Sequence, residues 1–287
     1  MPTPAAPARP TDTAKLRTGP FIDADIVYTQ RDGGRHHGLM PVPGRPETQW
    51  SHPHEPHRMQ VRNGRDIADT FSLDRSGFVL RHRPTRVGAF MNQDVVRTFY
   101  YPEIEALLKA ETGASRVLIF DHTTRRTGGS GNAERPGRLP VHRVHVDYTE
   151  RSAPQRVRDL VSPAEADRLL QGRVMQVNVW RPIKGPVVNS PLAVLEADSL
   201  GPGDLIETDL IYPDRTGEIY GLGHRDSHRW VWFPEMDVDE VLLLKSYDSL
   251  TDGRARFTPH SAFTDPTAPD NAPPRESIEV RSFLFFD

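Results

Sequence analysis

Residues 172–182 read GRVMQVNVWRP, and every second position from Met175 to Val179 is apolar. Alternation with a period of two is typical of a β-strand. Segments of similar character recur along the chain, and turn signals such as Thr251-Asp252-Gly253 separate them. The other predicted strands are residues 78–80, 116–121, 141–149, 192–197, 205–212, 230–233, 241–247, 256–260 and 277–286.

Helices are predicted in fewer places. Apolar residues follow helical spacing over residues 92–112, Gly113 ends the pattern, and Pro102 is expected to split it into two helices. Short helices are predicted over residues 154–160 and directly after Ser162, whose side chain suits an N-cap. We therefore predict a mainly β fold with flanking helices (α+β), built on a double-stranded β-helix, that is, a cupin-like jelly roll with an N-terminal helical buttress.

The N-terminal part of the chain shows no clear periodicity. Residues 1–18 are rich in Pro and Ala, and residues 31–65 combine several Pro with clustered His. We predict that residues 1–75 form an irregular extension, partly disordered or acting as a lid, and that residues 76–287 form the jelly-roll domain. A Gly-rich loop is expected over residues 127–137.

The amino-acid composition narrows the chemistry that the chain can carry. The 287 residues contain no Cys, which excludes disulfide scaffolds, iron–sulfur clusters, thiolate zinc sites and cysteine nucleophiles. The 12 His residues leave a metal site of His and carboxylate ligands open. The net charge of -3 and the lack of a long apolar run favour neither a nucleic-acid nor a membrane partner. Because no secretion signal is visible, we expect a cytoplasmic protein.

His145 and Asp147 lie two residues apart in the predicted strand over residues 141–149. Side chains two positions apart on a strand point to the same face, so an imidazole and a carboxylate lie side by side. Together with a His from a distant strand they make the 2-His-1-carboxylate triad that holds Fe(II) on one face. The pair alone is common by chance, and a third ligand is needed to support a metal site.

His260 offers that third ligand in the segment RFTPHSAF, and Arg275 and Ser277 follow at the start of the last predicted strand. This order fits an oxygenase that uses iron and 2-oxoglutarate. The distal carboxylate of 2-oxoglutarate needs a buried cation, and an Arg side chain beside a hydroxyl supplies it with several hydrogen bonds. Arg275 and Ser277 share strand parity and are predicted to point inward together.

Several short stretches within residues 78–287 form a recognisable series. They are FDHTTRR (120–126), HVDYT (145–149), NVWRP (178–182), SPLA (190–193), DEV (239–241), YDS (247–249), RFTPHSAF (256–263) and RESIEVR (275–281). The series resembles the AsaB-like hydroxylase/desaturase family, which includes the cephem 7α-methoxylase P8-chain proteins. The resemblance implies a non-haem iron, 2-oxoglutarate-dependent dioxygenase that hydroxylates, desaturates or otherwise oxidatively modifies a small specialised metabolite, with O2 as cosubstrate and succinate and CO2 as coproducts.

The resemblance and the strand parities together give a set of candidate site residues. Matched by position, the iron ligands are His145, Asp147 and His260. The residues assigned to 2-oxoglutarate are Arg275, Ser277 and Asn178. The residues assigned to the substrate pocket are Trp180, Arg181, Tyr148, His122 and Arg281.

Some of these residues have a second interpretation. Asn178 and Trp180 also fit a buried aromatic side chain with a polar edge, and Arg281 also fits an ion pair with Glu279 or another acid. The three histidines His52, His54 and His57 suggest zinc, but they lie among Pro residues with no predicted element to fix their geometry.

Two other functions are compatible with the same residues. A redox-neutral metallohydrolase or isomerase would hold zinc with the same ligands and would need neither O2 nor Arg275. A catalytically silent jelly-roll subunit that binds a small molecule or assists a partner enzyme fits the two-component system of the methoxylase, although intact ligands argue against it. The predicted partner is a small-molecule substrate, and Arg-rich pocket rims favour one that bears a carboxylate. A homo-oligomer or a partner enzyme is left open.

Overall fold

Strand β8 (Val174–Lys184) lies at the centre of the fold, because it has buried side chains on both faces. On one face Val177 and Val179 join an apolar cluster that includes helical residues. On the other face Trp180 packs between the two sheets, and Asn178, on the same face, is completely buried. A strand that is covered on both sides can hold polar groups in the interior on one face while the opposite face supplies apolar packing.

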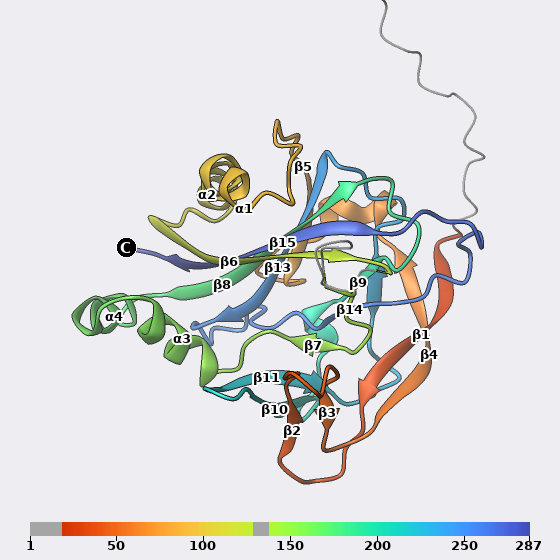
Figure 1. Ribbon diagram of the computed structural model, residues 1–287, viewed down its shortest axis with the longest axis horizontal. Helices are drawn as coiled ribbons and strands as arrows, with labels where there is room; N and C mark the ends of the chain where they lie inside the picture. The colour runs from red at the N-terminus through yellow and green to blue at the C-terminus, as the bar shows by residue number, and fades with distance from the viewer. Residues whose placement is uncertain (1–18, 129–137) are drawn as a thin grey trace, which may run out of the picture.

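The structure is a computed structural model that describes residues 19–128 and 138–287. In this part of the chain the strands form two sheets that face each other (Figure 1). The five-stranded sheet has the order β5 (Phe78–His82), β13 (Glu240–Asp248), β8, β15 (Glu276–Phe285) and β6 (Arg116–Arg126). The ten-stranded sheet has the order β1 (Phe21–Thr29), β4 (His54–Asn63), β12 (Trp230–Trp232), β9 (Leu192–Leu195), β14 (His260–Ala262), β7 (His145–Val146), β11 (Thr216–Leu222), β10 (Leu205–Ile211), β2 (His36–Leu39) and β3 (Gln49–Trp50).

Helices cover the outer face of the five-stranded sheet (Figure 1). Ile104 and Leu108 of helix α2 pack there against Val179 and Val280. The helical stretch consists of α1 (Gln93–Val95), a π-helix (Val96–Tyr100) and α2 (Tyr101–Thr112). The remaining helices of the described residues are α3 (Ser152–Leu160), α4 (Pro163–Leu169) and the 3-10 helices Arg65–Thr70 and Ala197–Ser199.

The space between the sheets holds an apolar cluster. Trp180, Leu242 and Leu244 of the five-stranded sheet meet Leu192 and Val194 of the ten-stranded sheet there. The predicted mainly β fold with a jelly-roll core and a helical buttress is therefore confirmed. Among the described residues, no helix combines the length and the apolar character needed to cross a membrane.

The N-terminal segment differs from its prediction. The expected irregular structure is wrong for residues 21–63, which contain β1 to β4. Strand β4 pairs with both β1 and β12, so the ten-stranded sheet contains strands from both sides of the predicted boundary at residue 75. The signal in β4 is weak because Met59 and Val61 are its only fully buried residues and Pro56 interrupts the pattern. The predicted disorder of residues 1–18 and most of the predicted loop, residues 129–137, lie outside the described residues.

Three local predictions also need correction. The strand predicted over residues 141–149 is reduced to the two residues of β7, because pairing with β11 and β14 is brief there. Strand β14 begins at His260, whereas the predicted strand ended there. Pro102 does not break the chain into separate helices: the helical backbone continues from the π-helix into α2, and Pro102 lies in the first turn of α2.

Candidate metal centre

Two neighbouring strands of the ten-stranded sheet bring His145 and His260 together. β7 and β14 are antiparallel, with His145 directly opposite His260 and their imidazole centroids 4.6 Å apart. Asp147 lies in the bend after β7, and its Oδ1 is 3.7 Å from Nε2 of His145. One ligand atom from each of the three side chains lies within 4.8 Å of the others, and no second group of this kind occurs among the described residues.

Backbone carbonyls orient both imidazoles in the same way. Nδ1 of His145 lies 2.9 Å from the carbonyl oxygen of Arg143, and Nδ1 of His260 lies 3.0 Å from that of Thr258. A carbonyl oxygen only accepts hydrogen bonds, so each Nδ1 carries the proton and donates it. Nε2 of each neutral ring therefore keeps its lone pair for a metal ion, which is the usual second-shell arrangement of histidine ligands.

The Asp147 carboxylate is held by one of its two oxygens. Oδ2 accepts hydrogen bonds from Nδ2 of Asn178 at 2.6 Å and from Nε of Arg281 at 3.2 Å. Oδ1 accepts no hydrogen bond from the described residues and is the oxygen nearest to His145. The carboxylate thus has one anchored oxygen and one that is available to a cation.

The ionisation states at this centre suit metal ligands. Burial disfavours the charged form of Asp147, but the nearby charge of Arg281 outweighs it and holds the pKa of this carboxyl well below its usual range. Burial lowers the pKa of His145 well below its usual value. Burial also opposes the charge of Arg281, yet the carboxylates of Glu279 and Asp147 raise its pKa above the usual range. Near neutral pH the centre therefore contains a carboxylate and a neutral imidazole.

Arg275 and Ser277 lie together in the interior, as strand parity predicts. The Arg275 guanidinium donates to the carbonyl oxygen of Ser190 at 2.6 Å and to Oγ of Ser277 at 3.3 Å, and it lies 5.2 Å from the centroid of the Trp180 ring. Among the described residues it forms no ion pair with a carboxylate within 4.0 Å. Burial lowers the pKa of Arg275 to about 9, and the charge of Arg125 acts in the same direction. A buried cation without a carboxylate partner is suited to an anionic ligand.

The remaining predicted residues divide into two groups. Trp180 contacts Arg275, and its buried Nε1 has no hydrogen-bond partner. Tyr148 packs against Phe120 and Phe283, beside Asp147. Trp180 therefore lies beside Arg275, and Tyr148 lies beside the metal ligand Asp147.

Arg181 and His122 do not lie with the metal ligands, contrary to their assignment to the substrate pocket. Arg181 points to the opposite face of β8 from Asn178, where it donates to the hydroxyl of Tyr100 and to two backbone carbonyls. His122 lies on the helical side of β6, where Nδ1 is 2.7 Å from the hydroxyl of Tyr101. Strand alternation explains both positions, because each residue is one place away from an inward-facing neighbour.

Asn178 and Arg281 differ from their assigned contacts. Both amide N–H groups of Asn178 are engaged, one by Asp147 and one by Glu279 at 3.1 Å, so its geometry fits orientation of Asp147 better than binding of 2-oxoglutarate. Arg281 forms ion pairs with Asp147, Glu279 and Asp121, which agrees with its second interpretation. The ion pair with Glu279 is the one that the second interpretation named, and the contact that sequence reasoning missed is the hydrogen bond from Asn178 to Glu279.

The three histidines considered for zinc separate in space. His52 lies 4.9 Å from His54 between ring centroids, but His57 stacks on His224 at 3.8 Å. None of them belongs to the one converging ligand group of the described residues.

Comparisons with known proteins agree with this geometry. A family model described as "Oxidoreductase/YMDC permease-like domain" matches residues 26–285. The hydroxylase/desaturase efuI of Hormonema carpetanum is 36% identical over 249 residues, which cover 79% of this chain and 83% of the relative. The Fe(II)/2-oxoglutarate-dependent dioxygenase nvfI of Aspergillus novofumigatus is 31% identical over 277 residues, covering 92% of this chain and 97% of the relative.

A solved structure extends the match to three dimensions. The iron and alpha-ketoglutarate-dependent endoperoxidase NvfI superposes with a TM-score of 0.83 at 28% identity, over 94% of this chain and 99% of that one. The relatives also include the hydroxylase/desaturase asaB, in agreement with the resemblance noted in the sequence. The chain therefore belongs to the AsaB-like hydroxylase/desaturase family of Fe(II)/2-oxoglutarate-dependent dioxygenases.

Proposed function

We propose that His145, Asp147 and His260 hold Fe(II), and that Arg275 and Ser277 bind the distal carboxylate of 2-oxoglutarate. The observation that carries this proposal is the convergence of three ligand atoms within 4.8 Å. Two imidazole nitrogens and one carboxylate oxygen suit Fe(II) and leave coordination positions for a chelating cosubstrate and O2.

The protein groups around these residues position them. The carbonyl oxygens of Arg143 and Thr258 fix the imidazoles, and Asn178 with Arg281 fixes the carboxylate of Asp147. When bound, iron and 2-oxoglutarate supply the oxidising chemistry, with succinate and CO2 as coproducts, and the protein supplies orientation and shielding from water.

The guanidinium of Arg275, which has no carboxylate partner among the described residues, favours this proposal over a zinc hydrolase. A hydrolase with the same ligands has no use for a buried cation next to a buried hydroxyl, whereas the second carboxylate of 2-oxoglutarate pairs with both. The family relatives support hydroxylation, desaturation or another oxidative modification of a small specialised metabolite as the reaction. A cytoplasmic location and a partner enzyme or homo-oligomer stay predictions.

Conversion of 2-oxoglutarate to succinate in the presence of Fe(II) and O2 tests the ligand set. We expect His260→Ala to lower the rate of succinate formation by at least about 100-fold, because a first-shell ligand is lost. The matched control is His82→Ala, an exposed histidine on β5 that we expect to leave the rate unchanged. Full succinate formation in both His260→Ala and His145→Ala would overturn the proposed ligand set.

A further inference from the structure

Arg143 is a partly buried cation that the metal centre does not use through its side chain. It lies two residues before His145, just outside β7, in an isolated β-bridge with Val27. Its guanidinium carbon lies 4.0 Å from the centroid of the Trp50 ring. Within residues 19–128 and 138–287 it forms no ion pair, and its Nη1 is shielded from solvent without a hydrogen-bond partner.

Three histidines of the N-terminal segment lie near Trp50, and each has one ring nitrogen without a hydrogen-bond partner among the described residues. The rings of His36 and His52 stack at 3.8 Å, and the Trp50 ring lies 5.1 Å from that of His54. Nδ1 of His36 and Nε2 of both His52 and His54 are buried with no hydrogen bond in the described structure. Burial lowers the pKa of His52 to about 4 and that of His54 to about 3, so both rings are neutral near pH 7. Arg143 therefore supplies a positive charge that these two rings do not.

This polar group adjoins the metal centre through a short series of strand contacts. His54 pairs with Thr29 across β4 and β1. The Thr29 hydroxyl, which is buried without a partner, lies 2.6 Å from the position that a Cβ on Gly221 would occupy. Gly221 in turn pairs with His145 across β11 and β7. Unpaired polar atoms thus extend from the N-terminal strands to the strand that carries a metal ligand.

Arg181 is a buried arginine with a structural role, and its hydrogen bonding differs from that of Arg143. Arg181 donates to the hydroxyl of Tyr100 and to the carbonyl oxygens of Val238 and Arg83. Arg143 has an aromatic support, and its shielded Nη1 group has no acceptor among the described residues. Because a buried donor without an acceptor destabilises the protein, a partner that supplies the acceptor is favoured.

We propose that Arg143, supported by Trp50, binds a carboxylate of the substrate beside the metal centre. This inference rests on the proposed oxygenase function and adds the chemical class of its substrate. The neutral histidines and the Thr29 hydroxyl offer further hydrogen bonds to the same oxygen-rich group, and the N-terminal strands act as the substrate-binding part of the ten-stranded sheet.

Binding of matched acids and amides tests this role without turnover. The probes are 2-naphthoate with 2-naphthamide, and cyclohexanecarboxylate with cyclohexanecarboxamide. Each is titrated by calorimetry into protein loaded with Fe(II) and 2-oxoglutarate under nitrogen. We expect the wild-type protein to bind at least one acid about tenfold or more tightly than its amide, as a charge-assisted pair of hydrogen bonds gives. Arg143→Gln is expected to abolish that preference.

Two control variants separate charge recognition from general damage. Arg58→Gln removes an exposed arginine of β4 whose pair with Asp25 is also exposed, and it should retain the preference. If Arg143→Gln does not fold, Arg143→Met, which keeps an apolar stem over Trp50, replaces it and should lose the preference equally. Thermal unfolding of each variant shows whether it is folded.

The visible absorption of the iron and 2-oxoglutarate complex, measured in the same samples, distinguishes two failures. If this absorption is absent from the wild-type protein, the proposed oxygenase function fails. If it is present but neither acid is preferred, or if the folded Arg143 variant keeps the preference, the role of Arg143 is overturned. An acid that erases the absorption has displaced 2-oxoglutarate, which also contradicts a separate carboxylate site.

Discussion

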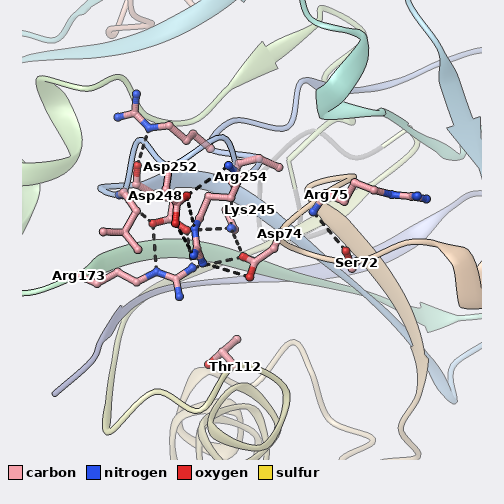
Figure 2. Close-up of polar contacts among 12 residues, drawn as sticks. Ser72, Asp74, Arg75, Thr112, Arg173, Lys245, Asp248, Asp252 and Arg254 are labelled. Carbon is pink, nitrogen blue, oxygen red and sulfur yellow. Dashed lines mark hydrogen bonds and ion pairs between the residues drawn. The ribbon is translucent and has the colours of Figure 1, made fainter.

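The metal centre and the ionic cluster around Lys245 both contain buried charges, but these charges find their partners in different ways. In the Lys245 cluster the ammonium group donates to Asp74 at 2.9 Å, to Asp248 at 2.8 Å and to the carbonyl oxygen of Ala255 at 3.0 Å. Figure 2 shows Arg173 and Arg254 closing the same cluster around the two carboxylates. The three donors of Lys245 have three acceptors, so nothing is left for a ligand.

The metal centre has the opposite character. Asn178 and Arg281 satisfy one oxygen of Asp147, while the other oxygen and the Nε2 atoms of His145 and His260 face one another without a donor between them. Such a group lacks a cation, whereas the Lys245 cluster contains its own. Buried charge therefore marks a functional site in this protein where the set of partners is incomplete, and a structural site where it is complete.

The largest effect on stability is expected from Lys245→Met. The change removes one of the two cations that pair with the buried carboxylate of Asp248, the other being Arg173, and should lower the free energy of unfolding by about 1.5–3 kcal/mol. Urea denaturation measures it. Lys184→Met removes an exposed lysine at the end of β8 and should cost less than about 1 kcal/mol. Equal losses in the two variants would mean that the Lys245 cluster does not stabilise the fold.

The next largest effect is expected from Arg281→Gln on iron affinity. The change removes the ion pair that orients Asp147, and loss of such an outer-shell contact typically weakens metal binding by about 10–100-fold. Anaerobic Fe(II) titration gives the affinity. Arg254→Gln, in the Lys245 cluster, is the matched control and should bind iron normally. An unchanged affinity in Arg281→Gln would show that Asp147 needs no such support.

The smallest effect concerns pH and His52. Its pKa in the folded protein is about 4, below the ordinary value of 6.5, so the unfolded chain binds a proton that the folded protein does not. Stability should therefore fall as the pH drops below 6.5, and this histidine contributes about 1 kcal/mol of the loss between pH 7 and 5.5. We expect His52→Asn to flatten the pH dependence by that amount in urea denaturation. An identical pH profile in both proteins would contradict a neutral, buried His52.

Local sequence signals were sufficient for much of the fold. Alternation predicted β8, Ser162 predicted the start of α4, and Gly113 predicted the end of α2. In the structure Gly113 has a left-handed backbone with φ 74°. These signals act within a few residues of the chain. Strand β4 was missed because its largely polar sequence is placed by pairing with β1 and β12, which the local pattern does not encode.

The candidate site was predictable in part for the same reason. Residue types and parity selected His145, Asp147, His260 and Arg275, because metal ligands and anion partners come from a small chemical set. The pairing that sets His145 opposite His260 is a long-range contact, and no local signal encodes it. The contact of Arg281 with Asp147 depends on how β15 lies against β8, where Arg281 pairs with Asn178. From strand parity alone, Arg281 could contact either an acidic residue of the protein or a bound ligand.

The most direct test of an incomplete metal centre is an anaerobic absorbance titration with Fe(II) and 2-oxoglutarate. The wild-type protein should develop a broad visible charge-transfer band only when both components are present. His145→Ala should show no band, Arg275→Gln should need more 2-oxoglutarate, and Lys184→Met should match the wild type. A wild-type protein without the band, or a His145→Ala variant that keeps it in full, would contradict the assignment of the metal centre.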